Sequence, residues 1–293
     1  MHFALCTFIK WYNVEKVSVI YVSEEPNMKK KIALIQMDVA LGKPEENFAH
    51  AEKLLTRAAE SGADILVLPE LWNTGFLPKP HEALVSMADE GGKETISLCG
   101  SIAKKYGVNI VAGSVTVSEG DALVNRAHIF DREGRLIETY DKMHAFTLVG
   151  EEKHFKGGTK TVRFLLDDIP CSAAICYDVR FCELIRAEAL SGVDLFFLPA
   201  AWPLLRLYHW EILNKARAVE NQMYLCAVNE SGYAGKTKYA GNSLLLSPWG
   251  EEILRLPEEE TIETGEIDLD TIRDIRESIN VFRDRKPELY HLS

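Results

Sequence analysis

The sequence predicts an α/β fold with two similar halves, because strand-like and helix-like segments alternate along the chain and one pattern occurs twice. Hydrophobic residues make up 47% and charged residues 26% of the 293 residues, which is normal for a globular protein with a sizeable core. No linker-like stretch divides residues 30–290, so we expect a single domain over 28–293. We expect residues 1–27 to be an N-terminal extension outside the fold, because Met28 directly precedes a strand-like run.

The first half of the chain alternates clearly between strand-like apolar runs and segments with helical spacing. An apolar run at 31–37 predicts a strand, and residues at helical spacing then predict an amphipathic helix: Asn47, Ala51, Leu54, Leu55 and Ala58. A strand at 65–68, a helix near 93–106 and a strand at 108–115 follow. The region 123–140 reads as a hairpin that turns at Arg132-Glu133-Gly134.

The second half continues the alternation. Strands are expected near 162–166, 171–175, 194–198, 223–228, 242–247 and 262–267. Helices are expected near 181–191, 207–220 and 269–278.

Two segments repeat one pattern. SGADILVLPELW (61–72) and SGVDLFFLPAAW (191–202) agree at six of twelve positions. Each begins with a helix-terminating Gly and ends with Leu-Pro after an apolar strand. Coincidence between two common connections is one interpretation, and pseudo-symmetric halves are the other. In the second case both Leu-Pro ends open onto one cleft, and Glu70 faces its counterpart Ala200.

Composition restricts the partners and the compartment. The net charge of −11 argues against nucleic acid, because phosphate neutralisation needs a basic face. An anionic substrate would need a local basic pocket. No pair of the six cysteines has metal-ligand spacing, so we expect reduced thiols and a cytoplasmic protein. The apolar start of the chain is too interrupted to span a membrane, since it contains Lys10, Glu15 and Lys16.

Cys176 is the first candidate for chemistry. It follows the apolar run 171–175 and precedes a helix predicted from about residue 181. Near a helix N-terminus a thiolate is stabilised by the dipole and by unpaired N–H groups, and the N–H of Tyr177 could hold an oxyanion. A lone cysteine is otherwise a small core residue, and we assign that role to Cys171, Cys182 and Cys226.

Glu70 and Lys142 stand in matching positions. Glu70 ends the apolar run ILVLPE, and Lys142 lies in ETYDKMH. As a base, Glu70 could take the thiol proton, transfer it to departing ammonia and then activate water. The alternatives are a helix cap or salt bridge for Glu70 and a solvated surface charge for Lys142.

Other catalytic patterns are excluded. Gly235-Lys236-Thr237 resembles the end of a phosphate-binding loop, but Glu230 stands where the first glycine belongs and no helix follows. The chain contains no G-x-S-x-G and no H-E-x-x-H pattern, which removes the simplest serine-hydrolase and zinc-protease interpretations.

Several blocks in chain order resemble the nitrilase, or carbon–nitrogen hydrolase, superfamily. LPELW around Glu70, YDKMH around Lys142 and CYDVRFCEL around Cys176 resemble its Glu–Lys–Cys signatures, and ARAVENQ (216–222) and SLLLSPWGE (243–251) resemble later blocks. The resemblance covers about residues 30–285. It departs at Cys182, where relatives often have proline. That change affects helix packing and no catalytic role.

The resemblance implies a fold, an assembly and a set of roles. The fold is an α-β-β-α sandwich, assembled as a homodimer or a multiple of dimers, with no cofactor and no metal. Cys176 is the nucleophile, Glu70 the general base and Lys142 the stabiliser of the tetrahedral intermediate. A second glutamate is expected in GEEKHF, where Glu151 is the better match and Glu152 stays open.

The substrate is predicted from the segment AAWPLLRLYHW (200–210) at the second Leu-Pro end. Arg206 is a candidate for binding a substrate carboxylate bidentately; otherwise it is a surface or subunit-contact arginine. We expect an apolar pocket walled by three residues that could equally be ordinary core: Trp72, Phe76 and Trp202. The pattern AxWPxxRxxHW is similar to the branch acting on ω-amides of 2-oxo acids such as 2-oxoglutaramate, which implies a small monocarboxylate-bearing amide.

Alternatives within and outside the enzymes remain open at this point. The first is an N-carbamoyl hydrolase or an aliphatic amidase, and a true nitrilase ranks lower. An ammonia-donating glutaminase would need a separate partner, because no synthetase domain is fused. A non-catalytic scaffold would have no use for Glu70, Lys142 and Cys176 together.

Overall fold

The computed structural model describes residues 28–77 and 80–290. The predicted extension 1–27 therefore lies outside the described residues, and the single domain over 28–293 stays a prediction. Within the described ranges no helix combines the length and the apolar character needed to cross a membrane.

The first half of the chain, together with β15 from near its C-terminal end, forms a seven-stranded sheet with the order β15-β1-β2-β4-β5-β6, and β3 pairs with β4. Strands β1, β2 and β4 are parallel neighbours, and β15, β5 and β6 join them in antiparallel pairs. The strands are β1 (Lys29–Gln36), β2 (Ile65–Val67), β3 (Asp89–Glu90), β4 (Asn109–Glu119), β5 (Ala122–Phe130), β6 (Leu136–Asp141) and β15 (Thr261–Asp268).

The second half forms a six-stranded sheet with the order β7-β8-β9-β10-β13-β14. Its three central strands β8, β9 and β10 are parallel, and the flanking pairs are antiparallel. Apart from β3, this repeats the sequence of parallel and antiparallel pairs in the first sheet, so the two halves are pseudo-symmetric as predicted. The strands are β7 (Arg163–Leu166), β8 (Ile169–Ala173), β9 (Leu195–Ala200), β10 (Tyr224–Asn229), β13 (Leu244–Leu246) and β14 (Glu252–Arg255).

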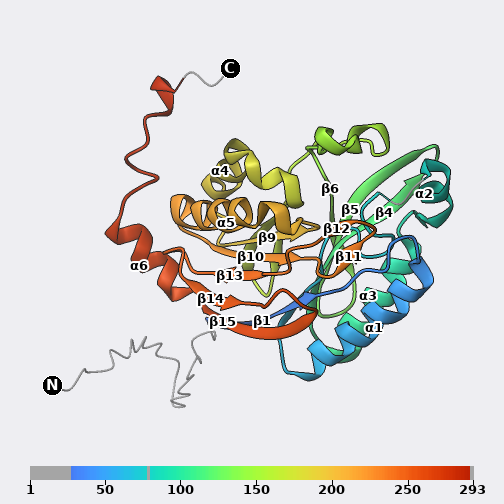
Figure 1. Ribbon diagram of the computed structural model, residues 1–293. Helices are drawn as coiled ribbons and strands as arrows, with labels where there is room; N and C mark the ends of the chain where they lie inside the picture. The colour runs from blue at the N-terminus through green and yellow to red at the C-terminus, as the bar shows by residue number, and fades with distance from the viewer. Residues whose placement is uncertain (1–27, 78–79, 291–293) are drawn as a thin grey trace, which may run out of the picture.

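Helices cover the outer faces of the two sheets. Helices α1 (Pro44–Glu60) and α3 (Lys93–Tyr106) lie on one side of the strands, and α4 (Cys182–Leu190) and α5 (Leu207–Asn221) lie on the other (Figure 1). The remaining helices and short strands are α2 (His81–Met87), α6 (Asp270–Ser278), β11 (Tyr233–Ala234), β12 (Thr237–Lys238) and the 3₁₀ helices η1 (Thr147–Val149), η2 (Glu151–Lys153), η3 (Cys176–Arg180), η4 (Leu204–Arg206) and η5 (Pro287–Leu289).

Strand β1 shows why the sheets form a sandwich. Because successive side chains of a strand point to opposite faces, Ile32 and Leu34 pack in the core between the two sheets. Ala33 and Ile35 pack on the other face, against helix α1. Both faces are covered, so the strand is apolar on both. The chain is therefore an α-β-β-α sandwich, as the resemblance implied.

The repeated segments lie at equivalent places in the two halves. Gly62 follows α1 with φ +79° and Gly192 follows α4 with φ +94°, a conformation that residues with a side chain rarely adopt. Each glycine turns the chain from a helix towards a strand, and the Leu-Pro pair directly follows β2 in the first half and lies near the end of β9 in the second. The repeat therefore reflects the symmetry of the fold.

Most predicted elements are present, with a few differences. The helix expected near 93–106 is α3, and the turn of the β5–β6 hairpin is closed by the Asp131 N–H, which donates to Arg135 at 3.1 Å. Sequence patterns missed the short helix α2, strand β14 and the β11–β12 hairpin, whose segments are too short for a clear period. Cys171 and Cys226 are buried as predicted, but Cys182 is exposed. The core role predicted for Cys182 is wrong, because the first residue of α4 faces away from the sheet.

Candidate active site

The two Leu-Pro ends meet directly. The backbone N–H of Glu70 donates to the carbonyl of Ala200 at 3.4 Å, so the predicted pairing across the cleft is confirmed. The N–H of Ala201 in turn donates to Glu70 Oε2 at 2.8 Å. The carboxylate after one strand is thus held by the backbone after its pseudo-symmetric counterpart.

Lys142 lies between two buried carboxylates. Its Nζ donates to Glu70 Oε1 at 2.8 Å and to both oxygens of Glu151 at 2.9 Å. The side-chain amide of Asn125 on β5 donates to Glu70 Oε1 at 2.8 Å. The backbone carbonyl of Asn125 accepts the backbone N–H of Lys142 at 2.9 Å. The ends of β2 and β6, strand β5 and the 3₁₀ helix η2, which carries Glu151, therefore bring these four side chains together.

Charge balance keeps Lys142 protonated. Burial alone lowers the pKa of Lys142, but the charges of Glu70 and Glu151 outweigh it and raise the pKa above the ordinary value. A charge this deeply buried is stable only when it is paired and hydrogen-bonded. The site thus contains a permanent cation.

The choice between Glu151 and Glu152 is decided by burial. Glu151 is fully buried, whereas Glu152, its neighbour in η2, is exposed. Glu151 Oε2 also accepts the N–H of Phe146 at 2.6 Å. Burial raises the pKa of Glu151, an effect that Lys142 opposes and Glu70 reinforces.

Cys176 occupies a strained turn between β8 and η3. Its φ is +48°, in a region that non-glycine residues rarely adopt and that often marks functional sites. Helix α4 begins at Cys182, close to the predicted start at about residue 181, so Cys176 precedes this helix as expected but does not lie at its N-terminus. Cys176 instead begins a five-residue 3₁₀ helix, which has too few aligned peptides for a strong dipole.

The thiol is correspondingly not acidic. Burial, and then the charge of Glu70, raise the pKa of Cys176 well above the ordinary value, although Lys142 lowers it. The expected stabilisation of the thiolate by a helix dipole is therefore corrected. Forming the thiolate needs a nearby base, and Glu70 is the carboxylate beside the thiol.

Asp178 anchors the Cys176 turn and was missed by the sequence analysis. It is fully buried, and its Oδ2 accepts the Ile175 N–H at 2.9 Å and the Tyr140 hydroxyl at 2.8 Å. Its Oδ1 accepts the N–H of His144 at 3.0 Å. Asp178 thus ties the cysteine turn to the segment that carries Lys142. An acidic residue two positions after the thiol was the available signal.

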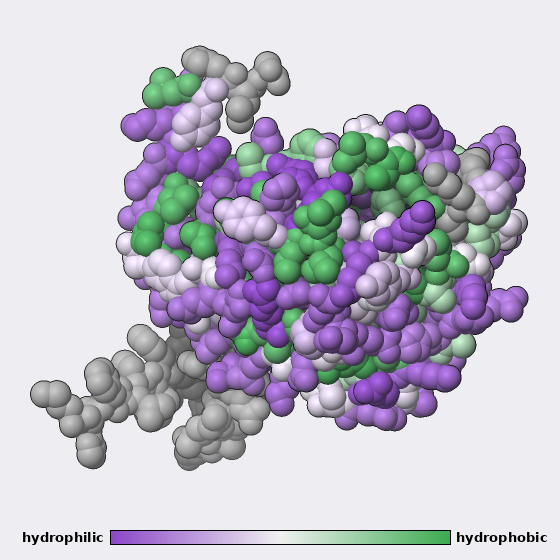
Figure 2. All heavy atoms as spheres, viewed as in Figure 1, coloured by the Kyte–Doolittle hydropathy of each residue, from purple (hydrophilic) through white to green (hydrophobic). Residues whose placement is uncertain are grey.

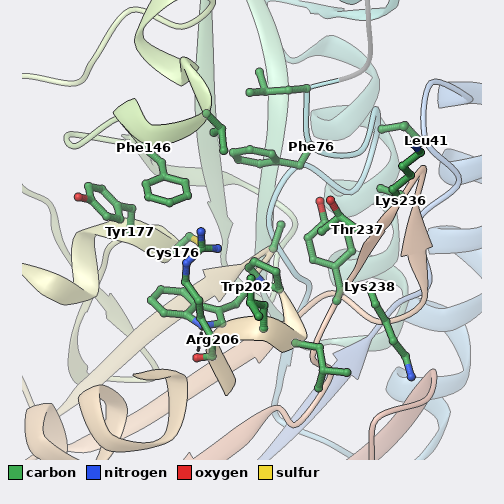
Figure 3. A pocket seen from close by; sticks show the side chains of 18 of the residues that line it. Leu41, Phe76, Phe146, Cys176, Tyr177, Trp202, Arg206, Lys236, Thr237 and Lys238 are labelled. Carbon is green, nitrogen blue, oxygen red and sulfur yellow. Dashed lines mark hydrogen bonds between the residues drawn. The ribbon is translucent and has the colours of Figure 1, made fainter. Parts of the chain in front are cut away.

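A cavity of about 1170 Å³ opens over these groups and is lined by Cys176 and Lys142. Phe76 lies with its ring centre 5.6 Å from Lys142 Nζ, and Trp202 also lines the cavity, so two of the three predicted wall residues do so. Tyr177 lines it with its ring 4.8 Å from that of Phe146. Figure 3 shows Cys176, Tyr177 and Phe146 on one side of the cavity and the β11–β12 residues on the other.

Trp72 does not belong to this wall. It is completely buried and packs edge-on against Phe48 at 4.9 Å. Its indole N–H donates to the carbonyl of Ala112 at 2.7 Å. Leu71, the residue before it, has φ +46°. The Trp72 side chain points into the core between the first sheet and its helices. The substrate-binding prediction for Trp72 is therefore wrong.

The cavity is basic although the chain is acidic. Its lining includes Arg206, as predicted, and none of the described lining residues is an aspartate or glutamate. The lining residues that were not predicted include Arg180, Lys236, Lys238 and Tyr239. The basic run Gly235–Lys238 is the sequence signal for two of these residues, although its pattern resembles only the end of a phosphate-binding loop. The local basic pocket that an anionic substrate requires is therefore present.

Comparisons with known proteins agree with this fold and show the family. Residues 31–277 match the model of the carbon–nitrogen hydrolase family, so the chain belongs to that family and is a hydrolase of non-peptide carbon–nitrogen bonds. It is 42% identical to the 2-oxoglutaramate amidase of Bacillus subtilis over 90% of this chain and 100% of that protein. It is 31% identical to an omega-amidase of Danio rerio over 90% and 98% of the two chains.

The solved structure of a similar amidase shows that protein after covalent reaction. A mutant amidase from Nesterenkonia sp. AN1 resembles the chain with a TM-score of 0.75 and 26% identity, over 89% of this chain and 95% of that one. In that structure the acetamide moiety of fluoroacetamide is covalently added at the active site cysteine.

Proposed function

We propose that this protein hydrolyses the ω-amide of a small 2-oxo acid, with 2-oxoglutaramate as the representative substrate. The observation that carries the proposal is one cavity lined by the Cys176 thiol, the Lys142 ammonium and the guanidinium groups of Arg180 and Arg206, neither of which pairs with a carboxylate among the described residues. The first group of residues suits amide cleavage, and the second suits a substrate carboxylate. The similarity to a 2-oxoglutaramate amidase supports the same substrate.

Acylation uses the Glu–Lys–Cys set. Glu70 takes the Sγ proton of Cys176, and the thiolate attacks the amide carbon. Lys142 and the Tyr177 N–H stabilise the oxyanion, a contribution comparable to an oxyanion-hole donor, whose loss costs about 10²–10³ in rate. Glu70 then passes the proton to the nitrogen, the carbon–nitrogen bond breaks, and ammonia leaves a thioester.

In deacylation the proton moves in the opposite direction, from water through Glu70 to Cys176. Glu70 deprotonates a water molecule, which attacks the thioester carbon. The tetrahedral intermediate collapses, the acid departs, and the proton returns to Cys176. Glu151 contacts Lys142 and not the thiol, so its role is to hold the ammonium in place.

Arg206 binds the substrate carboxylate in this proposal. It lines the cavity with its guanidinium carbon 5.2 Å from the Phe146 ring centre, and the described structure gives it no carboxylate partner. An unpaired guanidinium beside an aromatic face is suited to a planar carboxylate. Phe76 and Trp202 cover the apolar part of the substrate.

Mass spectrometry and a substrate panel test the proposal. Purified protein mixed with 2-oxoglutaramate and quenched early should carry an acyl group on Cys176, and Cys176→Ala should carry none and release no ammonia. The panel adds N-carbamoyl amino acids, aliphatic amides and nitriles, with ammonia release as the readout. A preference for any of these over 2-oxoglutaramate contradicts the substrate assignment.

We also propose a cytoplasmic homodimer, or a multiple of dimers, that binds no nucleic acid. The net charge of −11 supports the last point. Hydrophobic side chains remain exposed on α5, where Tyr208 is 69% and Ile212 48% exposed, and hydrophobic groups stand out on the largely hydrophilic face in Figure 2. Light scattering of Tyr208→Glu against wild type should show a smaller particle; an unchanged mass removes this face from the interface.

A further inference from the structure

Glu230 is a buried carboxyl group that the mechanism above does not use. It follows β10 directly, its side chain is completely buried, and neither of its carboxyl oxygens has a hydrogen-bond partner among the described residues. An isolated ionised carboxylate in such a place is strongly disfavoured, and the group becomes neutral by binding a proton. The environment therefore selects the neutral acid.

Glu230 and Glu70 share one peptide group. The carbonyl of Ala200 accepts the N–H of Glu230 at 2.9 Å and the N–H of Glu70 at 3.4 Å. The next residue, Ala201, donates its own N–H to the Glu70 carboxylate. The two glutamates therefore flank the same short stretch after β9.

The two carboxyl groups have opposite surroundings. Glu70 accepts hydrogen bonds from Lys142, Asn125 and Ala201, the environment of an ionised carboxylate, whereas Glu230 accepts none. When two neighbouring carboxyl groups differ in this way, one carries the charge and the other the proton. Burial, followed by the charges of Glu70 and Asp38, raises the pKa of Glu230 well above its usual range. Tyr239, a lining residue of the cavity, also lies close enough to be affected by the charge of Glu230.

We propose that Glu230 is a neutral carboxylic acid that acts as a positioning residue for the general base Glu70, an inference that rests on the proposed function. As a neutral group it fills the space behind the Ala200–Ala201 peptide without adding a second negative charge. Of the two glutamates, only Glu70 then carries a negative charge, and it is free to accept the Cys176 proton. An ionised Glu230 would instead force the pair to share one proton.

The charge state is tested without relying on activity. Infrared difference spectra of wild type minus Glu230→Gln at neutral pH should contain the carbonyl band of a protonated carboxyl group. A carboxylate band in its place overturns the inference. This measurement does not depend on which amide the enzyme cleaves, so it separates a failure here from a failure of the proposed function.

The positioning role is tested by comparing two variants on whichever amide the wild type cleaves. Glu230→Gln keeps the volume and the neutral charge, so its kcat should stay within about threefold of wild type, with an unchanged acid limb of the pH profile. Glu230→Ala leaves a hole behind Glu70 and should lower kcat about tenfold or more with little change in KM. A shifted acid limb in the Gln variant, or wild-type kcat in a folded Ala variant, overturns the role.

Discussion

The Lys142 ammonium donates to both carboxylate oxygens of Glu151, at 2.9 Å each. The same nitrogen lies 2.8 Å from Glu70, so one cation joins two acids of different roles. This arrangement fixes the ammonium where the oxyanion is expected to form.

Replacing Glu151 with Gln should therefore lower kcat about 10- to 100-fold while KM changes little, because the cation loses a charged partner and its fixed position. Glu152→Gln is the matched control, since its side chain is exposed in the same 3₁₀ helix, and it should behave as wild type. Steady-state ammonia release measures both variants. Equal activities of the two variants would contradict the positioning of Lys142 by Glu151.

Arg206→Ala should raise KM for 2-oxoglutaramate by about tenfold or more, because a charge-assisted bidentate contact is lost. For an uncharged aliphatic amide the KM should not change, since that substrate has no carboxylate. Arg180→Ala tests the neighbouring guanidinium of the same cavity as the competing anchor. If the Arg180 variant shows the charge-dependent loss and the Arg206 variant does not, the anchor has been assigned to the wrong arginine.

Substituting the two tryptophans of the repeat should have different effects, on stability for Trp72 and on activity for Trp202. Trp72→Phe leaves the Ala112 carbonyl without its donor in the core, so the free energy of unfolding should fall by about 1–3 kcal/mol with little loss of turnover. Trp202→Phe removes the indole N–H that binds the Arg206 carbonyl at 2.8 Å, and should mainly raise KM. Urea unfolding and kinetics on both variants measure the difference. If Trp72→Phe and Trp202→Phe changed the free energy of unfolding and KM to similar extents, the different roles of the two tryptophans would be contradicted.

His128 should make the fold sensitive to mild acid. It is buried, and burial, followed by the charge of Arg126, lowers its pKa to about 4. The unfolded chain binds this proton below about pH 6.5, so the stability from neutral His128 is complete above that pH and is lost as pH falls towards 4. Between pH 7 and 5 the loss is about 2 kcal/mol. In urea unfolding, the free energy of unfolding of His128→Gln should fall by about that much less than that of wild type over the same pH range. Equal losses in the two proteins would contradict the prediction.

A chain that starts at Met28 should keep full activity and remain in solution, because β1 begins at Lys29 and the family match begins at residue 31. Ammonia release and gel filtration compare it with the full chain. An insoluble truncation would show that residues 1–27 contribute to the fold.

Local patterns were sufficient for most of the fold. Apolar runs and helical spacing identified the long elements, and the repeated Gly and Leu-Pro positions identified the two halves. Short elements such as the β11–β12 hairpin escaped, because two-residue strands carry no period. Trp72 shows the same limit for side chains: its direction depends on the positive φ of Leu71, which the residue type does not reveal.

The sequence by itself determined the order of the elements, the family and the positions of Glu70, Lys142 and Cys176 at strand ends. Only the tertiary structure decided that Glu151 and not Glu152 faces Lys142, that Cys176 is a protonated thiol needing a base, and that Arg180 and Glu230 belong beside the site. The physical reason is that periodicity depends on neighbours along the chain. Charge state and side-chain burial depend instead on groups that are distant in sequence and meet only when the two sheets pack together.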